Sequence, residues 1–219
     1  MKTKKFLFTI AFLLALAIAA IAVFFNSGSS STKVSDSSIY AEYISAYTSG
    51  IISKKSTITV KLTENTANQV KKENLDIDDL FDFNPSISGK ANWVDNQTLE
   101  FKPDADLKGG THYSVDFNLG KLIEISDELK TFTFEFFTIK QNFDVTVEET
   151  RTIDKSTYKL QKTSGIITLA DYETIDNIQK LLSAKQDGNP VEVKISAAGE
   201  NKFSFELDSI NRTNVESLL

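Results

Sequence analysis

Alternation of apolar and polar residues with a period of two dominates the chain from residue 39 onward. The clearest case is a segment in which Ile58, Val60 and Leu62 fall on one face of a strand. The same alternation recurs in short segments separated by turn residues: Leu99 and Phe101; Tyr113, Val115 and Phe117; Phe132, Phe134 and Phe136; Val145 and Val147; Phe203, Phe205 and Leu207. This pattern predicts a mainly β protein built of β-sandwiches.

The strand-rich part divides into two predicted domains, with a boundary at Gln141 and Asn142. The first is a β-sandwich over residues 39–141, and the second covers residues 142–219 and contains one helix near residues 174–187. Thr174 is suited to be the N-cap of that helix, and Gly188 fits just past its end. Its predicted apolar face consists of Ile175, Ile178, Leu181 and Leu182.

An apolar run, Phe6 to Phe25, follows Lys2, Lys4 and Lys5 at the N-terminus. As a helix it is long enough to cross a hydrocarbon core of roughly 30 Å. The sequence therefore predicts a transmembrane signal anchor over residues 1–25, a Ser-rich linker over residues 26–38, and folded domains outside the cytoplasm. The alternative is a signal peptide that is cut after the small-x-small sequence ending at Ala22.

Composition excludes several classes of function. The chain has no cysteine, so disulfides, thiolate catalysis and cysteine metal sites are excluded, and it has a single histidine, His112. Its net charge of −6 and the lack of a basic stripe argue against nucleic-acid binding. No phosphate-binding loop, nucleophile elbow or pair of catalytic acids is found. We therefore predict no catalytic, cofactor-binding or metal-binding residue, no cofactor, and no enzymatic activity.

Three groups of residues are candidates for a functional site. The carboxylates of Asp76, Asp78, Asp79 and Asp82 lack the glycine and glutamate of a calcium loop, which favours a solvated acidic turn. His112 fits a surface position near a turn better than a ligand position. Trp93 and the segment from Phe132 to Phe137 could form a binding patch, but packing in the core is the favoured interpretation, with Phe137 on the opposite face.

The first domain carries an ordered motif: Pro85 and Gly89, then Trp93, Leu99 and Phe101, with the remaining positions at Pro103, Leu107, Gly110, Thr111 and Tyr113. This motif resembles the first domain of bacterial alpha-2-macroglobulins and, more loosely, bacterial immunoglobulin-like domains. The second domain resembles the next macroglobulin-type domain, through Gly165 to Asp171, the following helix, and Asn189-Pro190. The resemblance implies a fold with an N-terminal transmembrane helix and two immunoglobulin-like, macroglobulin-type β-sandwiches, the second of them incomplete.

The resemblance also implies a function. The chain would be the membrane-tethered scaffold portion of an alpha-2-macroglobulin-like, broad-range endopeptidase inhibitor in the bacterial periplasm or at the cell surface. The membrane would be contacted through Phe6 to Phe25, and proteases only through a further, C-terminal part. Because the chain has no cysteine, no thioester can be assigned to any residue. The alternative is an immunoglobulin-like adhesion or binding module of the cell surface.

Overall fold

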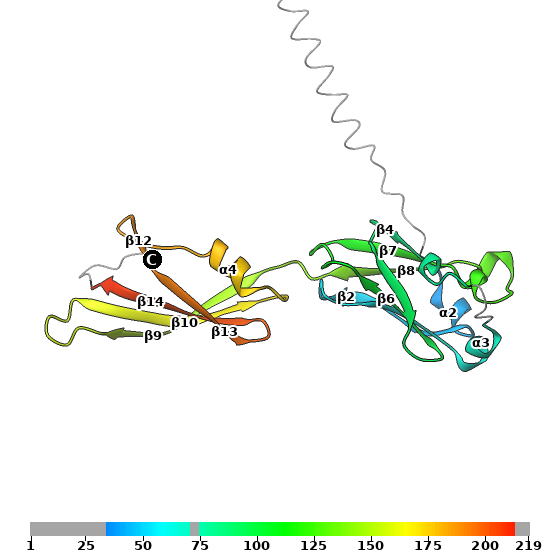
Figure 1. Cartoon of the computed structure of the whole chain (residues 1–219), viewed down its shortest axis with the longest axis horizontal. Helices are drawn as coiled ribbons and strands as arrows, with labels where there is room; N and C mark the ends of the chain where they lie inside the picture. Colours follow the sequence, from blue (N-terminus) through cyan, green and yellow to red (C-terminus); the bar gives the residue numbers. More distant parts are fainter. Residues whose placement is uncertain (1–33, 71–74, 213–219) are drawn as a thin grey trace, which may run out of the picture. The chain divides into compact units, whose positions relative to one another are not determined.

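The computed structural model describes residues 34–70 and 75–212, and these residues are mainly β (Figure 1). Two four-stranded sheets form the first domain. One has the order β1 (Ile44–Tyr47), β3 (Ile58–Leu62), β6 (Thr98–Pro103) and β5 (Gly89–Trp93), and the other has the order β2 (Gly50–Ile52), β8 (Phe132–Thr138), β7 (His112–Phe117) and β4 (Phe81–Asn84). All neighbours are antiparallel except β2 and β8, which are parallel.

Short helices lie between the strands of the first domain. They are α2 (Ser37–Tyr40), α3 (Glu64–Gln69) and the 3-10 helices η1 (Asp78–Leu80), η2 (Leu119–Lys121) and η3 (Asp127–Leu129). Asp36 caps α2, and the Thr63 hydroxyl caps α3 by accepting a hydrogen bond from the Thr66 N–H. The start of α2 at Ser37 shortens the predicted linker at its end.

The core of the first domain lies between its two sheets, as the alternation predicted. Ile58, Val60 and Leu62 of β3 are fully buried, and Phe132, Phe134 and Phe136 of β8 are buried against them in the same core. Aromatic rings join the sheets: Tyr47 of β1 meets Phe132 with ring centroids 4.9 Å apart. The predicted strand faces are confirmed for this domain.

The second domain is built on a single four-stranded antiparallel sheet in the order β13, β14, β10 and β9. The strands are β9 (Phe143–Thr152), β10 (Leu160–Leu169), β13 (Val193–Gly199) and β14 (Lys202–Asn211). Helix α4 (Ile175–Leu181) and a hairpin of β11 (Ala184–Gln186) and β12 (Asn189–Val191) connect β10 to β13. In Figure 1, α4 and β12 lie to the same side of this sheet.

The predicted second β-sandwich is therefore wrong. The segment that would have to supply an opposing sheet instead forms α4 and the two-stranded hairpin. Apolar residues of α4 and the hairpin, including Ile178, Leu182 and Val191, pack on the apolar face of β10, β13 and β14. The prediction that this domain is incomplete concerns residues after 212, which lie outside the described part of the chain, and it stays a prediction.

The predicted helix near residues 174–187 is correct at its start and wrong at its end. The Thr174 hydroxyl accepts a hydrogen bond from the Asn177 N–H, as an N-cap does, but the helix ends at Leu181. Asp187 and Gly188 have positive φ angles of 50° and 79° and form the two-residue turn between β11 and β12. Such turns need positive φ at both positions, so Gly188 serves the hairpin and not the helix end.

In residues 34–70 and 75–212, no helix is long and apolar enough to cross a membrane, which corrects the fold class predicted from the sequence. The expected span itself, Phe6 to Phe25, lies outside the described residues, as does most of the Ser-rich linker.

Candidate binding surface

A row of exposed apolar side chains lies along β9, which is an edge strand among the described residues. Phe143, Val145 and Val147 are 66%, 47% and 59% exposed. They pair across the ladder with Leu169, Ile167 and Gly165 of β10, whose side of the sheet is buried. We call Phe143, Val145 and Val147 the β9 apolar row; it belongs to the core face of the sheet but is left uncovered there.

A groove of about 310 Å³ runs beside this row. Val145 and Val147 form one wall, and the segment after α4, from Leu182 to Ala184, contributes to another. Its remaining lining is mainly apolar and comes from the core face of the sheet: Thr163, Ile167, Val193, Phe205 and Leu207. The groove is therefore an opening into the small core of the second domain.

The course of β9 is set by a bulge and a glycine. The pairing with β10 shifts between Gly165, which is opposite Val147, and Ser164, which is opposite Glu149, so that Glu148 is the extra residue. A Cβ atom at Gly165 would collide with the Thr146 carbonyl oxygen and with the ring of Phe205. The missing side chain at Gly165 is what allows β9 to lie against the sheet at this point.

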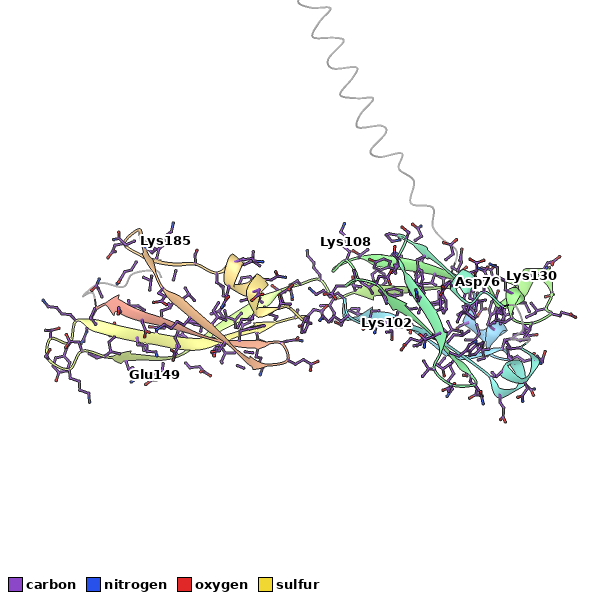
Figure 2. The ribbon with its side chains drawn as sticks, in the orientation of Figure 1. Asp76, Lys102, Lys108, Lys130, Glu149 and Lys185 are labelled. Atoms are coloured by element: carbon purple, nitrogen blue, oxygen red, sulfur yellow. The ribbon has the colours of Figure 1, made fainter. Side chains whose placement is uncertain are left out.

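The other face of this sheet is polar and carries its own ion pairs. The Lys162 ammonium lies 2.7 Å from a Glu206 carboxylate oxygen and 3.7 Å from one of Asp208, and Lys194 lies 2.7 Å from Asp208. On β9, Arg151 lies 3.8 Å from Glu149, with both side chains more than half exposed. Figure 2 labels Glu149 at the outer edge of β9. One face of the sheet is therefore solvated, while the other holds the open apolar row.

A second cluster of polar groups joins the chain around Ser53 and Lys54 to the segment after β10. The buried Asp171 carboxylate accepts hydrogen bonds from the Ser53 hydroxyl (2.5 Å) and the Lys54 N–H (2.8 Å). The Lys54 ammonium lies 2.9 Å from a Glu173 carboxylate oxygen. The Gln141 amide donates to the Asp171 carbonyl and accepts from the Asp171 N–H. Every polar group in this set has a partner, which is the arrangement of a structural contact.

The electrostatics of this cluster follow from its hydrogen bonds. The hydrogen bond from Lys54 lowers the pKa of Glu173 to about 2, with a further contribution from the Asn177 amide. Burial acts to raise the pKa of Asp171, but the hydrogen bonds from Lys54, Ser53 and Tyr172 outweigh it and leave that pKa below its usual value. Burial acts to lower the pKa of Lys54, and its pairing with Glu173 outweighs that effect and raises it.

Three of the four aspartates considered as a calcium site contact residues of the first domain. Asp78 accepts a hydrogen bond of 2.7 Å from the Ala91 N–H, and Asp76 accepts one of 3.1 Å from the Asp78 N–H at the start of η1. The Asp79 carboxylate lies 3.4 Å from the Lys121 ammonium. In residues 34–70 and 75–212, no three His, Asp or Glu side chains are placed to hold a metal ion. These carboxylates take part in hydrogen bonds and an ion pair around η1 of the first domain.

The other candidate residues, His112, Phe137 and Trp93, also lie in the first domain. His112 is a surface residue of β7, its ring is stacked on Phe137 with centroids 4.4 Å apart, and its Nε2 lies 3.2 Å from a Glu135 carboxylate oxygen. Phe137 faces away from the core, as predicted. Trp93 is partly buried and packs against the core from its margin, which agrees with core packing as the favoured interpretation.

Sequence reasoning missed the β9 apolar row, because Val145 and Val147 alternate as core residues do. The only available signal was indirect: the helix and hairpin residues of the second domain are too few to cover four strands. The polar cluster around Asp171 was also missed, since Ser53 and Lys54 lie more than 100 positions away from Asp171 in the chain.

Comparisons with known proteins find only distant structural similarities to this chain. No protein-family model and no curated protein matches the sequence. Among solved structures, an L,D-transpeptidase from Mycobacterium smegmatis matches with a TM-score of 0.33 and 11% identity, over 58% of this chain and 76% of that one. An L,D-transpeptidase from Mycobacterium tuberculosis H37Rv matches with a TM-score of 0.29 and 11% identity, over 73% of this chain and 61% of that one.

These similarities are too distant to carry an argument about function. The prediction that this chain has no enzymatic activity therefore stays a prediction. The resemblance to alpha-2-macroglobulins also stays a prediction, because no comparison bears on it.

Proposed function

We propose that this chain is a non-enzymatic protein-binding module, in which β9 of the second domain accepts an added β-strand from a partner protein. The observation that carries the proposal is the β9 apolar row, on a face where β10 and β14 are buried and β13 is partly buried. This proposal corresponds to the alternative function expected from the sequence, an immunoglobulin-like adhesion or binding module of the cell surface.

The backbone of β9 supports strand addition. In an antiparallel ladder alternate residues of an edge strand direct their N–H and C=O groups away from the sheet, where a further strand can bond to them. Main-chain bonds then supply affinity, and alternate side chains supply specificity. At β9 those alternate side chains are Phe143, Val145 and Val147, beside the groove of about 310 Å³.

The first domain supports this function as a closed scaffold. The core faces of its two sheets pack on each other, and the fully buried side chains include Leu99, Phe117 and Phe136. Its exposed apolar strand residues include Ile51 and Phe137, which pair with each other between β2 and β8, and its described strands show no row along one strand like that of β9. Binding is therefore assigned to the second domain.

We further propose that the chain acts outside the cytoplasm, in the bacterial envelope. The support is the order of Lys2, Lys4 and Lys5 before the apolar run, which is the arrangement of an export signal. Cell fractionation with N-terminal sequencing of the product tests this. Recovery of the full chain in the cytoplasmic fraction would contradict it.

A second candidate function is a scaffold role in an alpha-2-macroglobulin-like protease inhibitor. It is favoured by one observation, the placement of the motif residues in a single packed unit: Gly89 lies against Phe101, Leu99 is fully buried, and Tyr113 accepts the Lys108 N–H. Fold does not decide function, so this candidate depends on further domains and a Cys-x-x-Gln motif encoded beyond residue 219. Sequencing of the gene past that point tests it.

Site-specific photo-cross-linking tests the protein-binding function. A photoreactive phenylalanine analogue is placed at Val145 in the apolar row or, as the matched control, at Thr146 on the opposite face of the same strand, in the full chain and in the cells that make it. We expect a discrete protein adduct from position 145 and little from 146. Equal yields at the two positions, or none at either, would overturn the proposal.

A further inference from the structure

We propose that the partner of β9 is a second copy of this chain, bound with the two β9 strands antiparallel and centred on Val147. The inference rests on the proposed strand addition at β9 and names its partner. It is carried by the pattern of residues along β9, which is complementary to itself.

The two faces of β9 match in this pairing. The two-fold axis passes through Val147, and the bulged Glu148 is left unpaired. Thr146 of one copy then lies opposite Glu149 of the other, Val145 opposite Thr150, and Asp144 opposite Arg151. In the ladder with β10, Val145 and Thr150 pair with Ile167 and Thr163 on the core face. Asp144 and Arg151 pair with Thr168 and Lys162 on the polar face. Each opposing pair therefore lies on one face, which is the condition for a shared sheet.

The bulge is what makes this match possible. Asp144 and Arg151 are seven positions apart, and in a regular strand an odd separation places two residues on opposite faces. The extra residue at Glu148 restores them to the same face. Without the bulge, Asp144 and Arg151 would lie on opposite faces of β9 and could not oppose each other in such a pair.

Charge complementarity selects a second copy as the partner. The pairing sets Asp144 of each copy against Arg151 of the other, and a two-fold interface forms this ion pair twice. Among the described residues Arg151 pairs with Glu149 at 3.8 Å, and the two side chains are 58% and 61% exposed, so Arg151 is accessible to a new partner. Thr146 can donate its hydroxyl hydrogen to the opposing Glu149 carboxylate.

Glu148 opposes the association. The two copies of Glu148 meet near the two-fold axis, where like charges repel each other. Exposed ion pairs contribute little individually, so the dimer is expected to be weak, and Glu148→Gln is expected to strengthen it.

The absence of cysteine makes disulfide trapping a direct test in the full chain. Val147 opposes itself across the axis, with Cα atoms about 4.5 to 5.5 Å apart, within the range that a disulfide spans. Val147→Cys is expected to give a disulfide-linked dimer under mild oxidation. Thr146→Cys is the matched control: its two copies are displaced by roughly 7 Å along the strands, and little dimer is expected.

A charge exchange on the Val147→Cys background tests the register. Asp144→Arg places two arginines on each pairing strand, and Arg151→Asp places two aspartates there. Each variant alone should cross-link at least about tenfold more slowly, because both ion pairs become repulsive. A mixture of the two variants should recover the original rate as a mixed dimer. A variant that had lost its fold would not recover on mixing.

The outcomes separate this inference from the function on which it rests. Equal cross-linking of the two cysteine variants, or failure of the charge variants to recover on mixing, would overturn pairing with a second copy. If the photoreactive residue at position 145 then gave an adduct with a different protein, strand addition at β9 would stand and only the partner would be wrong. If it gave no adduct, both would fail.

Discussion

At the scale of single residues, Gly165 determines whether β9 can lie on its sheet. We predict that Gly165→Ala lowers the stability of the second domain by about 1 to 3 kcal/mol, because the new methyl group collides with the Thr146 carbonyl and the Phe205 ring. Denaturant unfolding followed by far-UV circular dichroism measures the change. Gly199→Ala is the control, since its Cβ would meet only Lys202 at ordinary contact distances, and it should change stability by less than about 0.5 kcal/mol.

The hydrogen bond between Lys54 and Glu173 makes a prediction about pH. The pKa of Glu173 is lowered to about 2 in the fold, so this contact stabilises the protein fully above the ordinary value of 4.5 and is lost as the pH falls from 4.5 toward 2. We predict that a carbon-detected NMR titration of Glu173 gives a midpoint near 2, and that Lys54→Met raises it toward 4.5.

Lys55→Met is the control for that titration. In the unaltered chain the Lys55 ammonium lies over the ring of Tyr172, 3.4 Å from the centroid, so Lys55→Met also removes one positive charge near Glu173. It should leave the midpoint of Glu173 nearly unchanged. A large rise of the Glu173 midpoint in the Lys55→Met variant would mean that nearby positive charge as such, and not the hydrogen bond from Lys54, lowers the pKa of Glu173.

Residue-level expectations from the sequence succeeded where a strand is covered on one face and solvated on the other. The burial of Phe132, Phe134 and Phe136 and the outward position of Phe137 could be read from alternation alone. Alternation marks which residues share a face and does not say what covers that face. Alternation therefore could not show that Val145 and Val147 are exposed or that Trp93 is only partly buried.

At the scale of elements, the segment between β10 and β13 determines the architecture of the second domain. The sequence predicted its helix through the capping residue Thr174 and the apolar spacing. Thr174 caps α4 and Ile178 is buried, but Leu181 of the predicted apolar face is 80% exposed. The hairpin was missed because Asp187 and Gly188 were read as the end of the helix, although this pair is a strong signal for a two-residue turn. With α4 shortened to seven residues and followed by the hairpin, β9 is left uncovered.

The open face of β9 makes a prediction about stability. Because Val145 is half exposed, Val145→Thr should cost less than about 1 kcal/mol. The same kind of change at its ladder partner, Ile167→Thr, removes buried apolar surface and buries a hydroxyl, and it should cost about 2 to 4 kcal/mol. Urea melts of the two variants compare these costs. A loss at Val145 as large as that at Ile167 would show that β9 is covered in solution.

At the scale of the whole molecule, the two domains have cores of very different size. The core of the first domain extends over eight strands in two sheets. In the part of the second domain that the structure describes, the buried apolar core consists of Ile167, Leu169, Ile178, Phe203, Phe205, Leu207 and Ile210. Because stability grows with the apolar surface removed from water, the second domain should be the weaker of the two.

The unequal cores predict that unfolding occurs in two steps, and the single tryptophan makes the steps separable. Trp93 lies in β5, so its fluorescence reports only on the first domain, whereas far-UV circular dichroism reports on the strands of both. In increasing urea, we expect the dichroism to change first as the second domain unfolds, while the fluorescence of Trp93 stays native. Ile167→Thr should move only the early step to lower urea, because its side chain belongs to the second core. Coincident transitions by the two probes would instead mean that contacts such as the hydrogen bonds to Asp171 couple the domains into one cooperative unit.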